Sequence, residues 1–199
     1  MTNKYQVILA DPPWFYNNRK TGGERNDKTK FGGGARKHYS LMPDHELYGM
    51  ATFINHLSDA RCALFLWATM PRLDFAVDLM RVWGFKYRTS AFTWVKSTKD
   101  GSSWKNGPGF YTASNTEIVL LGTKGCGLKP TKAMVNPIIM RPPGRHSEKP
   151  VEVVERINAM YPNYKKIELF ARSRMPGWDA WGNEISSIGD LSTMNSQEV

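Results

Sequence analysis

Short apolar runs alternate along this chain with segments in which apolar residues recur every three or four positions. The strand-sized runs are residues 4–10, 62–68, 85–96, 116–122 and 165–171. The segments with helical spacing are residues 43–57, 71–84 and 150–161, and each starts with proline. Strands that alternate with helices predict an α/β fold, with a mostly parallel sheet that helices cover on both faces.

The length and composition are those of one globular domain. The 199 residues, 41% apolar and 12% aromatic, are enough for one α/β core and short for two. We expect residues 1–185 to form this domain and the polar residues 186–199 to form a flexible tail. The apolar runs are too short to cross a membrane, and the first residues lack the apolar stretch of a secretory signal. Cys62 and Cys126 fit no metal or redox spacing, so we expect no metal site and a cytoplasmic protein.

The chain is strongly basic, with 27 Lys and Arg residues against 18 Asp and Glu residues and a net charge of +9. A protein that binds a polyanion needs such an excess, whereas an enzyme for small metabolites does not. Residues 18–37 hold seven cations against two acids: Arg19, Lys20, Arg25, Lys28, Lys30, Arg36 and Lys37 against Glu24 and Asp27. This glycine-rich stretch is either a solvated loop or a flexible clamp for a phosphate backbone. The segment from Lys96 to residue 115 mixes lysines with Trp104, which also suits nucleic acid.

The sequence Asp11-Pro12-Pro13-Trp14 ends the first predicted strand, because two consecutive prolines stop a strand. At the carboxyl end of a parallel strand, these residues lie where α/β sheets bind ligands. One interpretation is a stiff turn, with Trp14 packed on the core. The other is chemical: the Asp11 carboxylate and the Pro12 carbonyl can accept the two N–H groups of an exocyclic amine on a nucleobase. Trp14 would then offer a face on which a flipped-out base stacks.

Seven sequence blocks occur in a specific order between about residues 5 and 185: ADPPW, HYSLM, LFLWAT, WVK, NTEIVLLGTKG, RHSEKPVEV and IELFARSRMPGWDAWGNE. Together they resemble the MT-A type adenine-N6 methyltransferase family, which includes the mRNA adenine methyltransferase catalytic subunit and bacterial and phage DNA methyltransferases. The resemblance implies a Rossmann-like fold that depends on S-adenosylmethionine. No GxGxxG motif occurs, and we expect GTKGCG at residues 122–127 to be a turn between strands. The motif order is therefore the permuted one, with the catalytic tetrapeptide first.

The resemblance also implies a set of site residues. Asp11 to Trp14 would be catalytic, with Asp11 also beside the cofactor. The residues that would bind the cofactor are Lys149 and Ser147 at its carboxylate, Arg172 near the ribose and carboxylate, and Asn183 and Glu184 at the ribose hydroxyls. Those that would bind the substrate are Trp14, Tyr39, Arg19, Lys20, Lys28, Lys30, Lys96 and Trp104. Arg174 replaces a histidine of the eukaryotic enzyme, so its role is open. Each cofactor residue, taken singly, could instead be ordinary surface polarity, and Tyr39 could be a core aromatic.

The expected activity is therefore transfer of a methyl group to adenine N6 in nucleic acid. A small single domain resembles the prokaryotic and phage members of the family, which mostly act on DNA, so we expect duplex DNA in a bacterial or phage-infected cytoplasm. The alternatives are an RNA methyltransferase, a cytosine-N4 methyltransferase and a catalytically inactive nucleic-acid-binding subunit. The sequence leaves open the target sequence and whether the chain forms a homodimer or needs a partner subunit.

Overall fold

The computed structural model describes residues 4–14, 41–105, 107, 111–131, 134–144 and 148–185. In these ranges the strands are β1 (Tyr5–Ala10), β2 (Ser58–Ala68), β3 (Lys86–Lys96), β4 (Thr116–Lys124), β5 (Ile138–Arg141), β6 (Lys166–Leu169) and β7 (Asp179–Trp181). The α-helices are α1 (Asp44–Gly49), α2 (Ala51–Leu57), α3 (Leu73–Val82) and α4 (Glu152–Met160), and a 3₁₀ turn, η1 (Met70–Arg72), leads into α3.

The strands form one sheet in the order β5-β3-β4-β2-β1-β6-β7. Strand β4 runs antiparallel to both of its neighbours, and every other pair is parallel. The predicted mostly parallel sheet is therefore confirmed. The carboxyl ends of the other six strands meet at one edge of the sheet, which we call the carboxyl edge, and the first residues of β4 lie there too. The opposite edge is called the amino edge.

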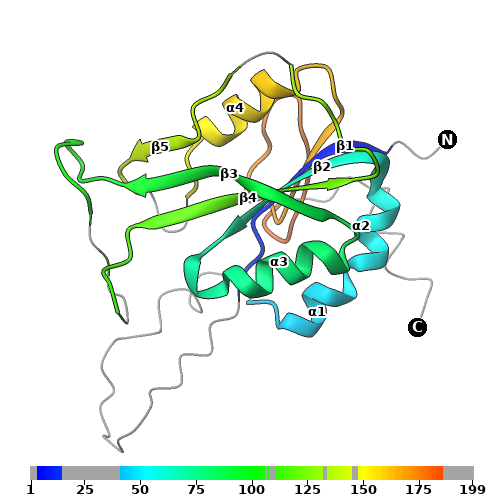
Figure 1. The fold of residues 1–199 in the computed structure, drawn as a ribbon, viewed down its shortest axis with the longest axis horizontal. Helices are drawn as coiled ribbons and strands as arrows, with labels where there is room; N and C mark the ends of the chain where they lie inside the picture. The colour runs from blue at the N-terminus through cyan, green and yellow to red at the C-terminus, as the bar shows by residue number, and fades with distance from the viewer. Residues whose placement is uncertain are drawn as a thin grey trace, which may run out of the picture.

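Helices cover both faces of the sheet, with α4 on one face and α1, α2 and α3 on the other (Figure 1). Alternate residues of β1 supply both cores: Ile8 joins the cluster under α1–α3, and Val7 joins the cluster under α4. Both side chains are fully buried. Burial on two faces is why the strand reads as a continuous apolar run rather than an alternating one.

Several boundaries differ from the sequence-based expectation. The helix expected over residues 43–57 is two helices, α1 and α2, that meet at Met50. Strand β2 begins four residues earlier than expected, at Ser58. Strands β5 and β7 were not anticipated, because four and three residues are too short to show a period. The turn expected at residues 122–127 is shorter than expected: residues 122–124 continue β4, and the chain turns at Gly125 and Gly127, which have φ values of +61° and +71°.

Strand β5 is an edge strand, and side chains occupy the outward backbone groups of its first residue, Ile138. The Ile138 N–H donates to Asn136 Oδ1 at 2.8 Å, and the Ile138 carbonyl accepts a bond from Arg156 Nη1 at 2.9 Å. Such contacts remove the free groups on which another chain could add a strand. Within the described ranges, no helix is both long and apolar enough to span a membrane. Residues 186–199, expected to form a tail, lie outside those ranges.

Candidate active site

The tetrapeptide Asp11-Pro12-Pro13-Trp14 leaves the sheet at the carboxyl edge, where backbone hydrogen bonds fix its path. The Asp11 N–H donates to the Leu169 carbonyl at 3.4 Å, which ties it to the end of β6. The Trp14 N–H donates to the Pro12 carbonyl at 2.8 Å, and the Pro13 carbonyl accepts a bond from the Met42 N–H at 3.0 Å. A carbonyl oxygen has two lone pairs, so the Pro12 carbonyl can accept a second hydrogen bond.

The Asp11 carboxylate belongs to a chain of alternating charges. Lys149 Nζ lies 3.2 Å from Asp11 Oδ1 and 2.9 Å from Glu117 Oε2. Lys96 Nζ forms an ion pair with the other carboxylate oxygen of the same glutamate, 2.6 Å from Glu117 Oε1. Lys149 Nζ also lies 5.2 Å from the centre of the Trp67 ring. Two acids and two lysines therefore neutralise one another at the carboxyl edge.

Glu117 is a site residue that the sequence analysis missed. It is the second residue of β4, and the start of a strand belongs at the amino edge when the sheet is parallel throughout. Because β4 alone is antiparallel, its first residues come to the carboxyl edge beside Asp11. The block NTEIVLLGTKG contained the residue, but no spacing rule connects it to Asp11 or Lys149.

The charges shift the protonation of each member of this chain. Burial pushes the pKa of Asp11 up, and Glu117 adds to that rise while Lys149 opposes it, so the pKa stays above its ordinary value. Burial would also raise the pKa of Glu117, but Lys149 and Lys96 outweigh it and the pKa is lowered. Burial disfavours the charged form of Lys149, yet Asp11 and Glu117 together raise its pKa. Lys149 and Glu117 are thus ionised, and Asp11 is a stronger proton acceptor than a free aspartate.

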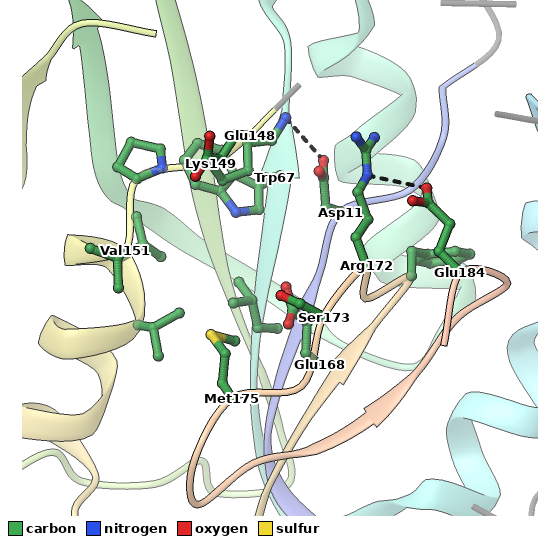
Figure 2. Close-up of a pocket in the computed structure, with 15 residues that line it drawn as sticks. Asp11, Trp67, Glu148, Lys149, Val151, Glu168, Arg172, Ser173, Met175 and Glu184 are labelled. Atoms are coloured by element: carbon green, nitrogen blue, oxygen red, sulfur yellow. Dashed lines mark ion pairs between the residues drawn. The ribbon is translucent and has the colours of Figure 1, made fainter. Parts of the chain in front are cut away.

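A cavity of about 580 Å³ opens between this chain of charges and helix α4. Figure 2 shows Asp11 and Lys149 on one side of it and Glu168, Ser173 and Met175 on the other. Its lining residues are Leu9, Asp11, Trp67, Glu148, Lys149, Pro150, Val151, Val153, Val154, Glu168, Phe170, Arg172, Ser173, Met175 and Glu184. A volume of this size is typical of sites for small ligands and cofactors.

The cavity presents both signs of charge to a ligand. Arg172 Nε lies 3.6 Å from Glu184 Oε1 at its mouth, as Figure 2 shows. Glu168, on β6, differs from the other acids here because it forms no hydrogen bond or ion pair within the described residues. Burial, followed by the charge of Asp11, raises the pKa of Glu168 to about 7. A half-buried carboxyl without a partner is costly, and a cationic group on a ligand would remove that cost.

The loop that carries Arg172 has an unusual backbone. Phe170, directly after β6, has a φ of +61°, and it is the one residue other than glycine with a positive φ in the described ranges. Such a conformation costs free energy and is often found at functional sites. At Gly182 a Cβ atom would lie 2.3 Å from the Ala171 carbonyl oxygen, so only glycine lets β7 pass this close. The close approach brings Glu184 to Arg172.

The structure brings four of the predicted cofactor residues to the cavity: Asp11, Lys149, Arg172 and Glu184. Asn183 is exposed and does not line it, although its neighbour Glu184 does. Arg174 is also not among the lining residues. Ser147 lies outside the described residues, as do Tyr39 and the basic residues Arg19, Lys20, Lys28 and Lys30.

Trp14 occupies the opposite side of the tetrapeptide from the cavity. Its ring is 5% exposed, belongs to the core under α1–α3 and meets Phe75 edge-on, with 5.9 Å between ring centres. This core packing is the first of the two interpretations offered for Trp14 in the sequence analysis. Stacking of Trp14 on a base stays a prediction. Lys96 lies inside the site rather than on the surface, while Trp104 is 56% exposed and pairs with Ser97 through a β-bridge.

The sequence profile of the MT-A70 family matches residues 5–184. This chain belongs to the MT-A70 methyltransferase family. It is 38% identical over 191 residues to the type II methyltransferase M.MunI of a Mycoplasma species, which covers 92% of this chain and 78% of that protein. It is 26% identical over 188 residues to the Drosophila melanogaster N(6)-adenosine-methyltransferase MT-A70-like protein and 25% identical to the human N(6)-adenosine-methyltransferase catalytic subunit METTL3. The chain spans 28% and 29% of the length of these last two proteins.

The chemistry open to this site follows from its groups. Within the described part of the chain, no three His, Cys, Asp or Glu residues gather closely enough to hold a metal ion. The cavity instead combines cations at Lys149 and Arg172, acids at Glu168 and Glu184, and apolar walls such as Val153. This set complements a zwitterionic ligand with an apolar body, and Asp11 at its border is placed to act on a second molecule.

Proposed function

We propose that this methyltransferase transfers a methyl group from S-adenosylmethionine to N6 of adenine in nucleic acid, with DNA as the preferred polymer. The observation that carries the proposal is the position of Asp11, which both lines the ligand cavity and starts the Asp-Pro-Pro-Trp turn. A methyltransferase must hold the methyl donor and the acceptor base next to each other, with the methyl group between them. A carboxylate that borders the cavity and lies at the carboxyl end of a strand meets this requirement.

The residues of the cavity fit the cofactor. S-adenosylmethionine supplies an electrophilic methyl group, and it carries an α-carboxylate, an α-ammonium, a ribose and an adenine. Lys149 and Arg172 are the cations for its carboxylate, and Glu168 is the partnerless acid for its ammonium. Glu184 at the mouth is an acceptor for ribose hydroxyls, and Val153 belongs to the apolar wall for the adenine.

Asp11 and Pro12 would act on the base. The lone pair of an exocyclic amine is delocalised into the ring, and acceptors for both N–H groups draw the nitrogen toward a tetrahedral form. The Asp11 carboxylate can accept one N–H group, and the second lone pair of the Pro12 carbonyl can accept the other. As positive charge develops on the nitrogen, Asp11 stabilises it, and its raised pKa suits it to take the proton that the methylated amine loses.

Lys149 would hold Asp11 in place during this step. Its ammonium already contacts both Asp11 and Glu117, so it fixes the direction of the aspartate while Glu117 keeps the lysine charged and oriented. Removal of Glu117 would leave the lysine with a single carboxylate partner in the site. We therefore assign Glu117 a positioning role.

The choice of DNA rests on similarity rather than on the site. M.MunI, which shares 38% identity with this chain, is a type II methyltransferase, and the family resemblance favours DNA for bacterial and phage members. The METTL3-like relatives are named as N(6)-adenosine-methyltransferases, which supports the N6 position of adenine. RNA is the alternative polymer, and the METTL3 likeness is the observation that favours it.

The test is transfer of tritium from labelled S-adenosylmethionine to unmethylated duplex DNA and to RNA hairpins, with nucleoside analysis of the product. We expect label in N6-methyladenine from DNA. Asp11→Ala should abolish transfer and leave cofactor affinity, measured by calorimetry, within a few-fold of the wild-type value. Lys149→Ala should weaken cofactor binding much more. Label in 4-methylcytosine, or equal loss of cofactor affinity in the two variants, would contradict the roles proposed here.

A further inference from the structure

Five cations gather at the amino edge of the sheet, far from the site described above. They are Lys4 before β1, Arg61 on β2, Lys86 and Arg88 on β3, and Lys124 at the end of β4. We call them the amino-edge patch. Four of the five are exposed and Lys124 is half-buried. The proposed methyl transfer gives these residues no task.

Contacts between the strands place these cations on neighbouring strands of this edge, where Lys124 Nζ is itself held by Asn55 Oδ1 and Ser58 Oγ, each at 2.7 Å. Arg88 Nε donates to Thr123 Oγ1 at 2.7 Å, and Thr123 is the register partner of Lys86 on the neighbouring strand. Arg61 Nε donates to the Gly127 carbonyl at 3.2 Å, in the turn that follows β4. Lys124 pairs in register with Cys62, so its side chain leaves the sheet on the face opposite to that of Arg61. Burial lowers the pKa of Lys124, Cys62 opposes that shift, and the charge of Lys4 adds a smaller lowering.

The five cations have no acidic partner, a property that they share in the described ranges with Lys99, Lys105, Lys129, Arg156 and Lys166. None of them forms an ion pair within the described ranges, whereas Arg72, Arg81, Lys96, Arg141, Lys149, Lys165 and Arg172 all do. The nearby Asp59 carboxylate accepts a bond from the backbone N–H of Arg61 at 3.0 Å and not from its guanidinium. Like charges this close repel one another, and a bound polyanion would relieve the repulsion.

Two of the side chains are also held in a form that suits phosphate. Arg61 and Arg88 each use Nε to bind a neutral acceptor of the protein. The two terminal nitrogens of each guanidinium then point away from that anchor and keep their donors. A fixed guanidinium loses little conformational entropy on binding, and its paired donors match two oxygens of a phosphate.

We propose that the amino-edge patch is a second contact surface for a nucleic-acid phosphate backbone, separate from the one at the active site. The choice of nucleic acid over another polyanion rests on the proposed function. Arg88 and Lys96 are eight residues apart on one strand, about 26 Å at 3.3 Å per residue. At 3.4 Å per base pair, a duplex shorter than about eight base pairs held at the carboxyl edge does not reach the patch. The patch binds a second segment, and one protein molecule can bridge two.

The test is a bridging experiment with the full-length chain. One duplex is attached to beads, a second duplex carries a fluorophore, and recovery of the fluorophore on the beads is measured against protein concentration. The wild-type protein should recover the labelled duplex at low salt, and Lys86→Gln/Arg88→Gln should reduce recovery at least fivefold. The double variant Lys86→Arg/Arg88→Lys, which keeps the charge but not the anchored guanidinium of Arg88, should recover more than Lys86→Gln/Arg88→Gln and less than the wild type. Arg81→Gln removes a cation from the outer face of α3 and should have no effect.

Methyl transfer to a single short duplex gives an independent readout. Its kcat/KM should be unchanged in Lys86→Gln/Arg88→Gln, because that duplex occupies only the carboxyl edge. Bridging that persists in this variant would overturn the proposal and point instead to a dimer with two active sites. A wild-type protein that bridges nothing would also overturn it. Tighter binding of polyglutamate than of DNA, lost in the same variant, would reassign the patch to an acidic protein. Bridging without methyl transfer would leave the patch standing while the proposed function failed.

Discussion

Glu168→Gln is expected to stabilise the protein and to weaken its binding of S-adenosylmethionine. The Glu168 side chain is half-buried, has no partner in the described residues, and has a pKa raised from 4.5 to about 7. Because the folded-state pKa is higher than the unfolded one, the fold favours the protonated acid. That preference is fully present below pH 4.5 and is lost as the pH rises through 7.

The magnitude follows from this difference. At 1.36 kcal/mol per pKa unit, ionising Glu168 above pH 7 costs at most about 3 kcal/mol, because water reaches the cavity mouth. The glutamine side chain does not ionise, so the variant lacks this destabilisation. Its free energy of unfolding should exceed that of the wild type by about 1–3 kcal/mol at pH 8, and the two proteins should be nearly equal at pH 5. Urea denaturation of the ligand-free proteins at both pH values measures the difference.

Cofactor binding should change in the opposite direction. The ammonium of the cofactor needs the ionised carboxylate, so the wild-type affinity should rise roughly fourfold between pH 6 and pH 8 as Glu168 loses its proton. The rise stays below tenfold because an α-ammonium itself begins to lose its proton near pH 8. In Glu168→Gln this rise should disappear, and the affinity at pH 8 should fall by roughly 10- to 100-fold, the value of one charge-assisted hydrogen bond. Calorimetric titration at a series of pH values measures both effects.

Glu184→Gln is the matched control, because Glu184 lines the same cavity but lies half exposed beside Arg172. It should lower the affinity while keeping the wild-type rise between pH 6 and pH 8. Equal stabilisation of Glu168→Gln at pH 5 and pH 8 would refute the account of a partnerless half-buried acid. An unchanged pH dependence of cofactor binding in that variant would refute its role at the ammonium.

Three further outcomes are expected. Glu117→Ala leaves Lys149 with one carboxylate partner in the site, so kcat should fall at least tenfold while circular dichroism stays unchanged; full kcat would remove its positioning role. Arg156→Ala frees the Ile138 carbonyl at the sheet edge, so light scattering on heating should begin at a lower temperature than in the wild type, with a similar melting temperature. Trp83→Phe removes the bond of 2.8 Å from a fully buried indole N–H to α1, which should cost about 1–3 kcal/mol in urea denaturation.

The sequence by itself determined the elements whose signal is local and long enough to read. Strand β1 and the Asp11-Pro12 stop followed from a continuous apolar run and from proline chemistry, and α4 followed from its helical period. The order of the sequence blocks identified the family. Because Asp11 and Arg172 both follow predicted parallel strands, the sequence also predicted that they lie at the same edge of the sheet. These inferences need only neighbours in the sequence and the direction of strands.

Only the tertiary structure decided which groups touch. The antiparallel direction of β4 brings Glu117 to Lys149, and that direction depends on the pairing of strands far apart in the chain. Whether Glu168 has a partner likewise depends on which side chains surround it in the folded protein, and no sequence pattern along β6 predicts that. The cations of the amino-edge patch are spread over three strands and the residue before β1, and they gather only once the sheet is assembled. Local propensity acts over a few residues, whereas charge and burial act through space. More of the fold than of the electrostatics of the site could therefore be predicted from the sequence.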